Sequence, residues 1–438
     1  MLDGEKTMIA TIRASMGSML RRYGPNAKVR AVLVGAPLIL SFAAGCIYSA
    51  LLGERLRYPD EMEYVTIAYN LVHIHLYSLD GVHVTAFRSP GYPLFIAFFL
   101  AFGSPLVLVR IANFAALSIA GFLLSKILAR FSFPVAALVS PYLVVFYPVL
   151  FYTAGTLYPQ TLAMALLLAS LYLLVEKEHS ALYFALSGAV FGILILVVPS
   201  FLFKLPIFVL AALILKRRKM IAMPAIVTGT AMLVISICTV VNYVNFNTFI
   251  PVSTNTGANF LIGNSENTTP NAGPNADISR YTSLADGMNE VERDRFYQQQ
   301  AIKWIVNHKE KAVKLYTLKT LNYFNYRNDL HTASEGSQSK DLLMLLTYGT
   351  MLLILCIRLA LAKLVPLSRL ETFFILMYTL NAFADAIVFT RIRYRLPYDG
   401  FLIGVVAICG ERLYHGARRG NVVKRRREQT DKREKAIR

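Results

Sequence analysis

Long apolar runs recur along almost the whole chain and restrict what it can fold into. Hydrophobic residues make up 55% of its 438 residues, which is above the usual share for soluble domains. A helix of about 20 apolar residues is long enough to cross the hydrocarbon core of a bilayer. The sequence therefore predicts an all-α polytopic membrane protein with spans in the runs 31–52, 93–128, 134–150, 158–176, 180–198, 201–215, 221–245, 341–362, 370–389 and 396–414.

The second apolar run is too long for one upright helix, and Gly103-Ser104-Pro105 interrupts it. We interpret 93–103 as a juxtamembrane helix that precedes a single crossing. This count places the basic clusters on the same side as both termini, and cytoplasmic loops are enriched in Lys and Arg. It predicts about ten spans with both termini in the cytoplasm. The clusters are Lys126 with Arg130, 176–179, 216–219, Lys363 with Arg369, and the C-terminal tail.

The same topology divides the chain into five segments. The net charge is +19, and the last 28 residues alone hold 11 Lys or Arg against 4 Asp or Glu. The tail has almost no aromatic residues between its basic ones, so we expect it to meet anionic lipid head groups and not nucleic acid. The segments are a basic cytoplasmic N-terminus (1–30), a transmembrane module (31–245) with a first outer loop (53–92), a large outer loop (246–340), C-terminal transmembrane helices (341–414) and a basic cytoplasmic tail (415–438).

The large outer loop is expected to be mixed in structure. It is polar and rich in Asn, Gly and Thr up to about residue 290, and apolar residues then recur at near-helical spacing. Asp286 or Asn289 could cap the helix that begins there.

Two adjacent carboxylates, Asp60 and Glu61, follow directly after the first span. If 60–76 is helical, Asp60 and Tyr64 share a face, and Glu61 points about 100° away. One carboxylate can then face a cleft while the other faces elsewhere. Acidic residues at a helix start also stabilise the helix through its dipole, so a purely structural interpretation stays open.

Three arginines, Arg391, Arg393 and Arg395, surround Tyr394 just before the last span. They lie on the side of the membrane where positive charge is normally scarce. Arginine at the end of a span can simply extend to the interface. Three together favour an anionic partner instead, and guanidinium groups match phosphate by paired hydrogen bonds.

Arg88 and Lys204 are weaker candidates for the same role. Each lies near the outer end of a span, where an unpaired charge is costly. Asp385 precedes the arginine cluster by one to two helical turns, and we expect it to pair with one of those arginines.

The first outer loop also carries His73, His75 and His83. With a nearby carboxylate they could hold a divalent metal, but surface histidines near lipid head groups are the commoner case. The four cysteines lie far apart inside apolar runs and indicate buried small residues. The chain has no P-loop, no GxGxxG after a strand and no Ser/His/Asp order, so the sequence predicts no certain cofactor.

Four stretches, in this order, resemble one family of membrane enzymes. They are Pro59-Asp60-Glu61 to Pro93-Leu94, Asn242-Tyr243 to Gly263-Asn264, Asn289-Glu290-Val291-Glu292-Arg293, and Arg393-Tyr394-Arg395-Leu396-Pro397. The family is that of the bacterial GT-C membrane glycosyltransferases, relatives of the dolichyl-phosphate-mannose protein mannosyltransferases (glycosyltransferase family 39) and of the lipid A aminoarabinose transferases.

The resemblance implies a GT-C-like bundle of about ten transmembrane helices in a bacterial inner membrane, with a periplasmic active site. It also implies a polyprenyl-phosphate sugar as donor and a catalytic acidic residue at Asp60, with Glu61 beside it. The acceptor stays unknown. The residues expected to bind substrate are Tyr64, Arg88, Tyr92, Lys204, Arg391, Arg393, Tyr394 and Arg395.

These expectations depend on one geometric condition, which is that Asp60 and the arginines around Arg393 meet in one site. Asp60 would then act as general base in an inverting sugar transfer, and the arginines would bind the leaving phosphate. Two alternatives stay open from the sequence. One is a flippase or transporter of a lipid-linked saccharide, and the other is a transferase of the O-antigen-ligase type.

Overall fold

The computed structural model describes residues 27–177, 180–215, 222–271, 273–327 and 338–437. These residues form helices joined by loops, with no β-strand among them. The basic segment 1–26, residues 178–179 and the basic cluster 216–219 lie outside the described residues, and so do the side chains of the tail from residue 416 onward. The predicted all-helical class is confirmed for the described part of the chain.

The first half of the chain forms most of a helical bundle. Its elements are α2 (Ala27–Leu52), α3 (Pro59–His73), α4 (Gly91–Ala101), α5 (Leu106–Arg130), α6 (Pro134–Val145), α7 (Pro148–Ala154), α8 (Gln160–Glu176), α9 (Ala181–Val197), α10 (Phe201–Ala212) with η1 (Leu213–Leu215), and α11 (Ala222–Phe246).

The second half adds a lobe at one end of the bundle and then returns to it. Its elements are α12 (Thr256–Gly263), η2 (Gly273–Asn275), α13 (Ser279–Leu284), α14 (Glu290–Asn307), α15 (Lys309–Asn322), α16 (Gln338–Met344), the π-helical η3 (Leu345–Gly349), α17 (Thr350–Ala360), η4 (Leu361–Lys363), α18 (Arg369–Ala386) and α19 (Ile392–Ile437).

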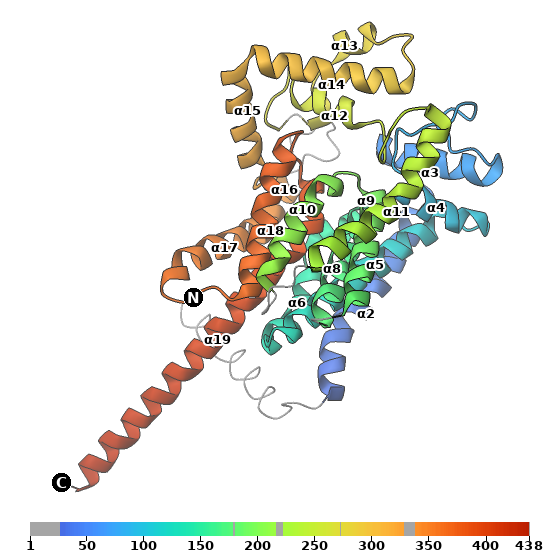
Figure 1. The fold of residues 1–438 in the computed structure, drawn as a ribbon. Coiled ribbons are helices and arrows are strands. Elements are labelled where there is room, and N and C mark those ends of the chain that lie inside the picture. Colours follow the sequence, from blue (N-terminus) through green and yellow to red (C-terminus); the bar gives the residue numbers. More distant parts are fainter. Residues whose placement is uncertain (1–26, 178–179, 216–221, 272, 328–337, 438) are drawn as a thin grey trace.

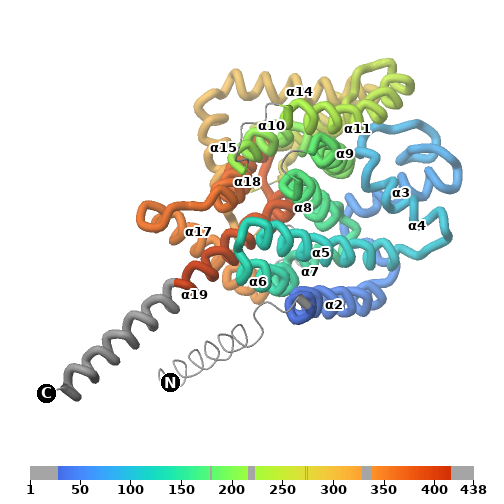
Figure 2. Tube along the Cα trace, turned by 60° about the horizontal axis from the view of Figure 1, so that its bottom comes forward, coloured from blue at the N-terminus to red at the C-terminus, as the bar shows by residue number. Residues whose placement is uncertain are grey.

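We call α12 to α15 the outer lobe. Figure 1 shows it covering one end of the bundle, while the C-terminal part of α19 projects from the opposite end. Figure 2 shows α2, α5, α6 and α8 packed side by side in the bundle, with α3 and α4 at its edge.

Within the described residues, four helices are long and apolar enough to cross a membrane, namely Lys28–Leu52, Leu106–Arg130, Ala222–Phe246 and Gln338–Lys363. A fifth results if α6 and α7, bent by 58° at their junction, count as one span. This is fewer than the ten that we expected. The other runs form shorter apolar helices, such as α8 and α9 with 17 residues each, or carry more charge, as α18 does with Arg369, Glu371 and Asp385.

Three local expectations are confirmed. The second apolar run divides at Gly103, which has a φ of +65°, so that α4 ends before it and α5 begins after it. A helix, α3, starts at Pro59 and carries Asp60 in its first turn. Asn289, and not Asp286, caps α14, because its side chain accepts from the backbone N–H groups of Val291 and Glu292.

Close contact between α9 and α11 depends on two glycines spaced one helical turn apart. A Cβ at Gly188 would lie 2.0 Å from Thr230 Oγ1 and 2.3 Å from the carbonyl oxygen of Val227, and one at Gly192 would lie 2.9 Å from the carbonyl oxygen of Ala231. Small residues at this spacing let two helix backbones approach closely in apolar surroundings.

We therefore expect Gly188→Leu to destabilise the bundle by about 1–3 kcal/mol, because the added side chain has to push α11 away. The measurement is the midpoint of thermal unfolding in detergent. Gly229→Leu on α11 is the matched control, because a Cβ at Gly229 meets no atom within 4 Å. Equal midpoints for the two variants would contradict this packing.

Candidate functional site

The two carboxylates in the first turn of α3 face different parts of the molecule. Glu61 is 1% exposed, and its Oε2 accepts from the backbone N–H groups of Arg57 at 2.6 Å and Tyr58 at 3.0 Å. Its Oε1 accepts from the backbone N–H of Leu157 at 2.7 Å. Both oxygens of Glu61 are thus occupied by backbone donors, which fix the start of α3 against the connection between α7 and α8.

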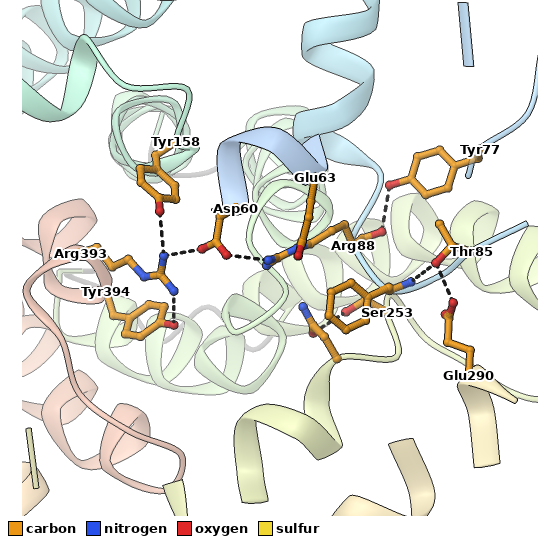
Figure 3. A network of polar contacts seen from close by, with 12 residues as sticks. Asp60, Glu63, Tyr77, Thr85, Arg88, Tyr158, Ser253, Glu290, Arg393 and Tyr394 are labelled. Atoms are coloured by element: carbon orange, nitrogen blue, oxygen red, sulfur yellow. Dashed lines mark hydrogen bonds and ion pairs between the residues drawn. The ribbon is translucent and has the colours of Figure 1, made fainter. Parts of the chain in front are cut away.

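Asp60, one position earlier on the helix, faces two arginines from distant parts of the chain (Figure 3). Arg88 Nη2 donates to Asp60 Oδ1 at 2.7 Å, and Arg393 Nη1 forms an ion pair with Asp60 Oδ2. The expected meeting of Asp60 with the arginine cluster, across 333 positions of sequence, is confirmed for Arg393.

The two arginines decide the charge of this carboxylate. Burial by itself would raise the pKa of Asp60, but the positive charges of Arg393 and Arg88 outweigh it and hold the pKa below its usual value. Burial raises the pKa of the neighbouring Tyr64 to about 12. At neutral pH the site therefore contains an ionised Asp60 beside a protonated Tyr64.

Aromatic and acidic side chains hold the two guanidinium groups in place. Arg88 donates from Nε to Glu63 Oε2 at 2.5 Å and lies 5.2 Å from the centre of the Tyr64 ring. Arg393 donates to the hydroxyl of Tyr158 at 3.3 Å and to that of Tyr394 at 3.1 Å. We call Asp60, Glu63, Arg88 and Arg393 the Asp60 cluster.

The Asp60 cluster is partly exposed to solvent, whereas two other ion pairs, Lys204–Asp385 and Arg395–Asp399, are buried. Its side chains are 15–32% exposed. The Lys204–Asp385 pair, at 2.5 Å, is only 4% and 7% exposed, and Arg395 and Asp399 are both fully buried. Solvent therefore reaches the side chains of the Asp60 cluster but hardly reaches the other two pairs.

Two sequence expectations need correction here. Asp385 pairs with Lys204 and not with an arginine of the 391–395 cluster. Arg395 points into the bundle, where it donates to the carbonyl oxygens of Tyr323 at 2.9 Å and Asn325 at 2.7 Å, and its guanidinium lies 3.5 Å from the centre of the Tyr348 ring. Side chains two positions apart on a helix face different directions. Arg393 therefore contacts Asp60, whereas Arg395 does not join it there.

Two further candidates, Arg391 and Tyr92, have contacts with residues outside the Asp60 cluster. Arg391 packs against Gly273 of η2, whose φ is +51°. Tyr92 is fully buried, accepts a hydrogen bond from Asn113 at 3.0 Å, and packs edge to face against Tyr64 with the ring centres 5.2 Å apart.

One carboxylate of the outer lobe ties the segment before Arg88 to the lobe (Figure 3). Glu290, the first residue of α14, accepts from Thr85 Oγ1 at 2.6 Å, from the backbone N–H of Ala86 at 2.8 Å and from the Thr254 hydroxyl. The Thr254 N–H in turn donates to the Ala86 carbonyl at 2.9 Å. The position of Arg88 thus depends on α14 as well as on α3.

A second tie fixes the turn that leads into α19. The Lys319 amine, on a fully buried side chain, donates to the carbonyl oxygens of Gly263 at 2.9 Å and Val388 at 2.8 Å, and Thr390 Oγ1 donates to the Lys319 carbonyl at 2.8 Å. This turn lies a few residues before Arg393. Both arginines of the Asp60 cluster are therefore anchored to the outer lobe.

Sequence reasoning missed Glu63, Tyr158 and Glu290. Glu63 lies three positions after Asp60 on the same helix face, so helical spacing was a usable signal for it. Tyr158 comes from another segment, and no local pattern marks it. Glu290 belongs to the stretch Asn289-Glu290-Val291-Glu292-Arg293, but nothing in that stretch indicates its contact with the segment before Arg88.

Among the residues that the structure describes, no group of three or more His, Cys, Asp or Glu side chains is arranged to hold a metal ion. Of the three histidines considered in the sequence, His83 pairs with Asp80 at 2.8 Å, and His73 stacks on Tyr69.

A scan against protein-family models gives no match for this chain, and a search of curated proteins gives none either.

Substitution of Glu290 tests the link between the outer lobe and Arg88. In Glu290→Ala we expect faster hydrogen–deuterium exchange at the amides of Ala86 and Thr254. The Ala86 amide loses its acceptor, and the Thr254 residue loses the hydroxyl contact that keeps its amide against the Ala86 carbonyl. Hydrogen bonds to a charged group contribute about 1.5–3 kcal/mol each, and less at this partly exposed site.

Glu310→Ala on exposed α15 is the control, and it should leave these two amides unchanged. Unaltered exchange in Glu290→Ala would show that Glu290 does not hold the two segments together.

Proposed function

We propose that the protein transfers a sugar from a polyprenyl-phosphate carrier to an acceptor hydroxyl, with Asp60 as general base. The observation that carries this proposal is the Asp60 cluster, in which an accessible carboxylate lies between two arginines. A transfer of this kind needs a group that accepts a proton and cations that bind a phosphate, and both are side by side here.

In the proposed reaction, a carboxylate oxygen of Asp60 takes the proton of the acceptor hydroxyl. The acceptor oxygen forms a bond to the anomeric carbon of the sugar while the bond from that carbon to the phosphate oxygen breaks. Attack from the face opposite the phosphate inverts the anomeric centre. A base positioned in this way contributes about 10²–10⁴-fold to the rate.

The leaving group is a polyprenyl phosphate monoester. Its second pKa is about 6, so it departs as an anion without a strong general acid. Arg393 and Arg88 supply fixed positive charge at the place where this anion forms, and fixed charge in a poorly hydrated site stabilises it more than water would. Glu61, whose oxygens are occupied, has a positioning role in this scheme, and Lys204 and Arg395 support the bundle.

The finer topology belongs to the same proposal. Counting α8, α9, α10, α18 and the first part of α19 as spans, with the bent α6–α7 pair as one, completes ten crossings. The chain then forms a GT-C-like bundle in a bacterial inner membrane, with both termini cytoplasmic and the Asp60 cluster on the periplasmic face. The polyprenyl tail lies between helices, and the outer lobe, which covers this end of the bundle, contacts the acceptor.

We expect Asp60→Asn to lower sugar transfer by about 10²–10⁴-fold, because the amide cannot accept the proton, while binding of the lipid carrier persists. The measurement is the release of free polyprenyl phosphate from a panel of radiolabelled polyprenyl-phosphate sugars by the purified protein. Asp286→Asn, an exposed carboxylate of the outer lobe, should leave the release unchanged.

Other outcomes distinguish the alternative functions. A flippase would move the intact glycosylated carrier across a vesicle membrane and release no free polyprenyl phosphate. A transferase of the O-antigen-ligase type would release a polyprenyl diphosphate from a diphosphate carrier. Release that is equal in wild type and Asp60→Asn would refute the role of Asp60 as base.

A further inference from the structure

We propose that Asp60 occupies the anion position of the donor phosphate when no donor is bound, so that donor binding displaces this carboxylate and thereby produces the free base. This inference deepens the proposed function and rests on it. It assigns Asp60 two successive roles, first as an internal anion that neutralises the arginines and then as general base.

The geometry of the Asp60 cluster carries this inference. Each oxygen of Asp60 is engaged by a different guanidinium, Oδ1 by Arg88 and Oδ2 by Arg393. The two arginines converge on one small anion, as they would on two oxygens of a phosphate. A donor phosphate that uses both arginines therefore has to take over the donors that now bind Asp60.

The same contacts make Asp60 a poor base in the observed state. A carboxylate whose two oxygens both accept from guanidinium groups has little tendency to take up a proton, and the pKa of Asp60 lies below its usual value for this reason, despite the opposing effect of burial. Moving the arginines to the phosphate removes this stabilisation of the charged form. It also places a new negative charge nearby, and both changes raise the pKa of Asp60 toward a useful value for catalysis.

Neighbouring side chains can hold Arg88 and Arg393 in place while the donor phosphate replaces Asp60 between them. Arg88 keeps its bond to Glu63, and Arg393 keeps its bonds to the hydroxyls of Tyr158 and Tyr394, so neither guanidinium depends on Asp60 alone. Asp60 itself is 21% exposed and can turn away from the arginines. The proposal predicts an ordered reaction, in which the donor binds before the acceptor is activated.

The test is the affinity of purified full-length protein for geranylgeranyl monophosphate, measured by calorimetry in detergent. Asp60→Asn removes the competing charge, so it should bind this lipid about tenfold more tightly than wild type, a change that corresponds to about 1.4 kcal/mol. Asp60→Ser is a second variant with the same expectation. Geranylgeraniol, which lacks the phosphate, should bind wild type and both variants equally.

Glu63→Gln is the matched control. This substitution removes one negative charge from the same cluster but leaves both bonds of Asp60 to the arginines in place. The affinity of Glu63→Gln for geranylgeranyl monophosphate should therefore rise by at most about twofold. Unchanged or weaker binding in both Asp60 variants, or an equal rise in Glu63→Gln, would overturn the displacement while leaving the transferase proposal intact. Arg393→Gln should weaken binding of geranylgeranyl monophosphate both in the wild-type protein and in the Asp60 and Glu63 variants. If the wild-type protein does not bind this lipid phosphate, both proposals are overturned.

Discussion

The ion pairs of Asp60 join three segments that are far apart in the chain. They connect the first turn of α3, the segment before α4 and the first turn of α19. Each segment is fixed separately before it reaches the cluster, α3 by Glu61, the Arg88 segment by Glu290, and the start of α19 by the turn that Lys319 holds. The charges thus meet because rigid elements bring them together, and the cost of their partial burial is offset by mutual pairing.

Charge pairs in this molecule differ mainly in access to solvent. Lys204–Asp385 and Arg395–Asp399 are closed off within the bundle, where a broken pair would leave an uncompensated charge. The Arg358–Glu371 pair, with Arg412 on the second oxygen of Glu371, ties α17, α18 and α19 together in the same way. The Asp60 cluster alone among these is 15% or more exposed on every side chain, which is what a site that exchanges ligands requires.

The sequence predicted the parts of this structure that depend on local chemistry. Patterns over a few residues predict the helical class, the break at Gly103, the cap at Asn289 and the different orientations of Asp60 and Glu61. The pairing of Asp60 with Arg393 was the geometric condition on which the expected mechanism depended, and the structure shows that it is met. The partner of Asp385 and the burial of Arg395 did not follow, because both depend on how α10, α18 and α19 rotate about their axes. Only four or five helices of the described part are long enough by themselves to span a membrane, fewer than the ten apolar runs, since apolar composition does not determine where a helix ends.

The short distance along the chain between Ala86 and Arg88 limits how the outer lobe can move. Ala86 is fastened to α14 through Glu290, and Arg88 follows only two residues later. Two residues of extended chain span at most about 7 Å. A larger separation of α14 from the bundle would therefore pull Arg88 off Asp60, so the lobe and the charged cluster behave as one mechanical unit.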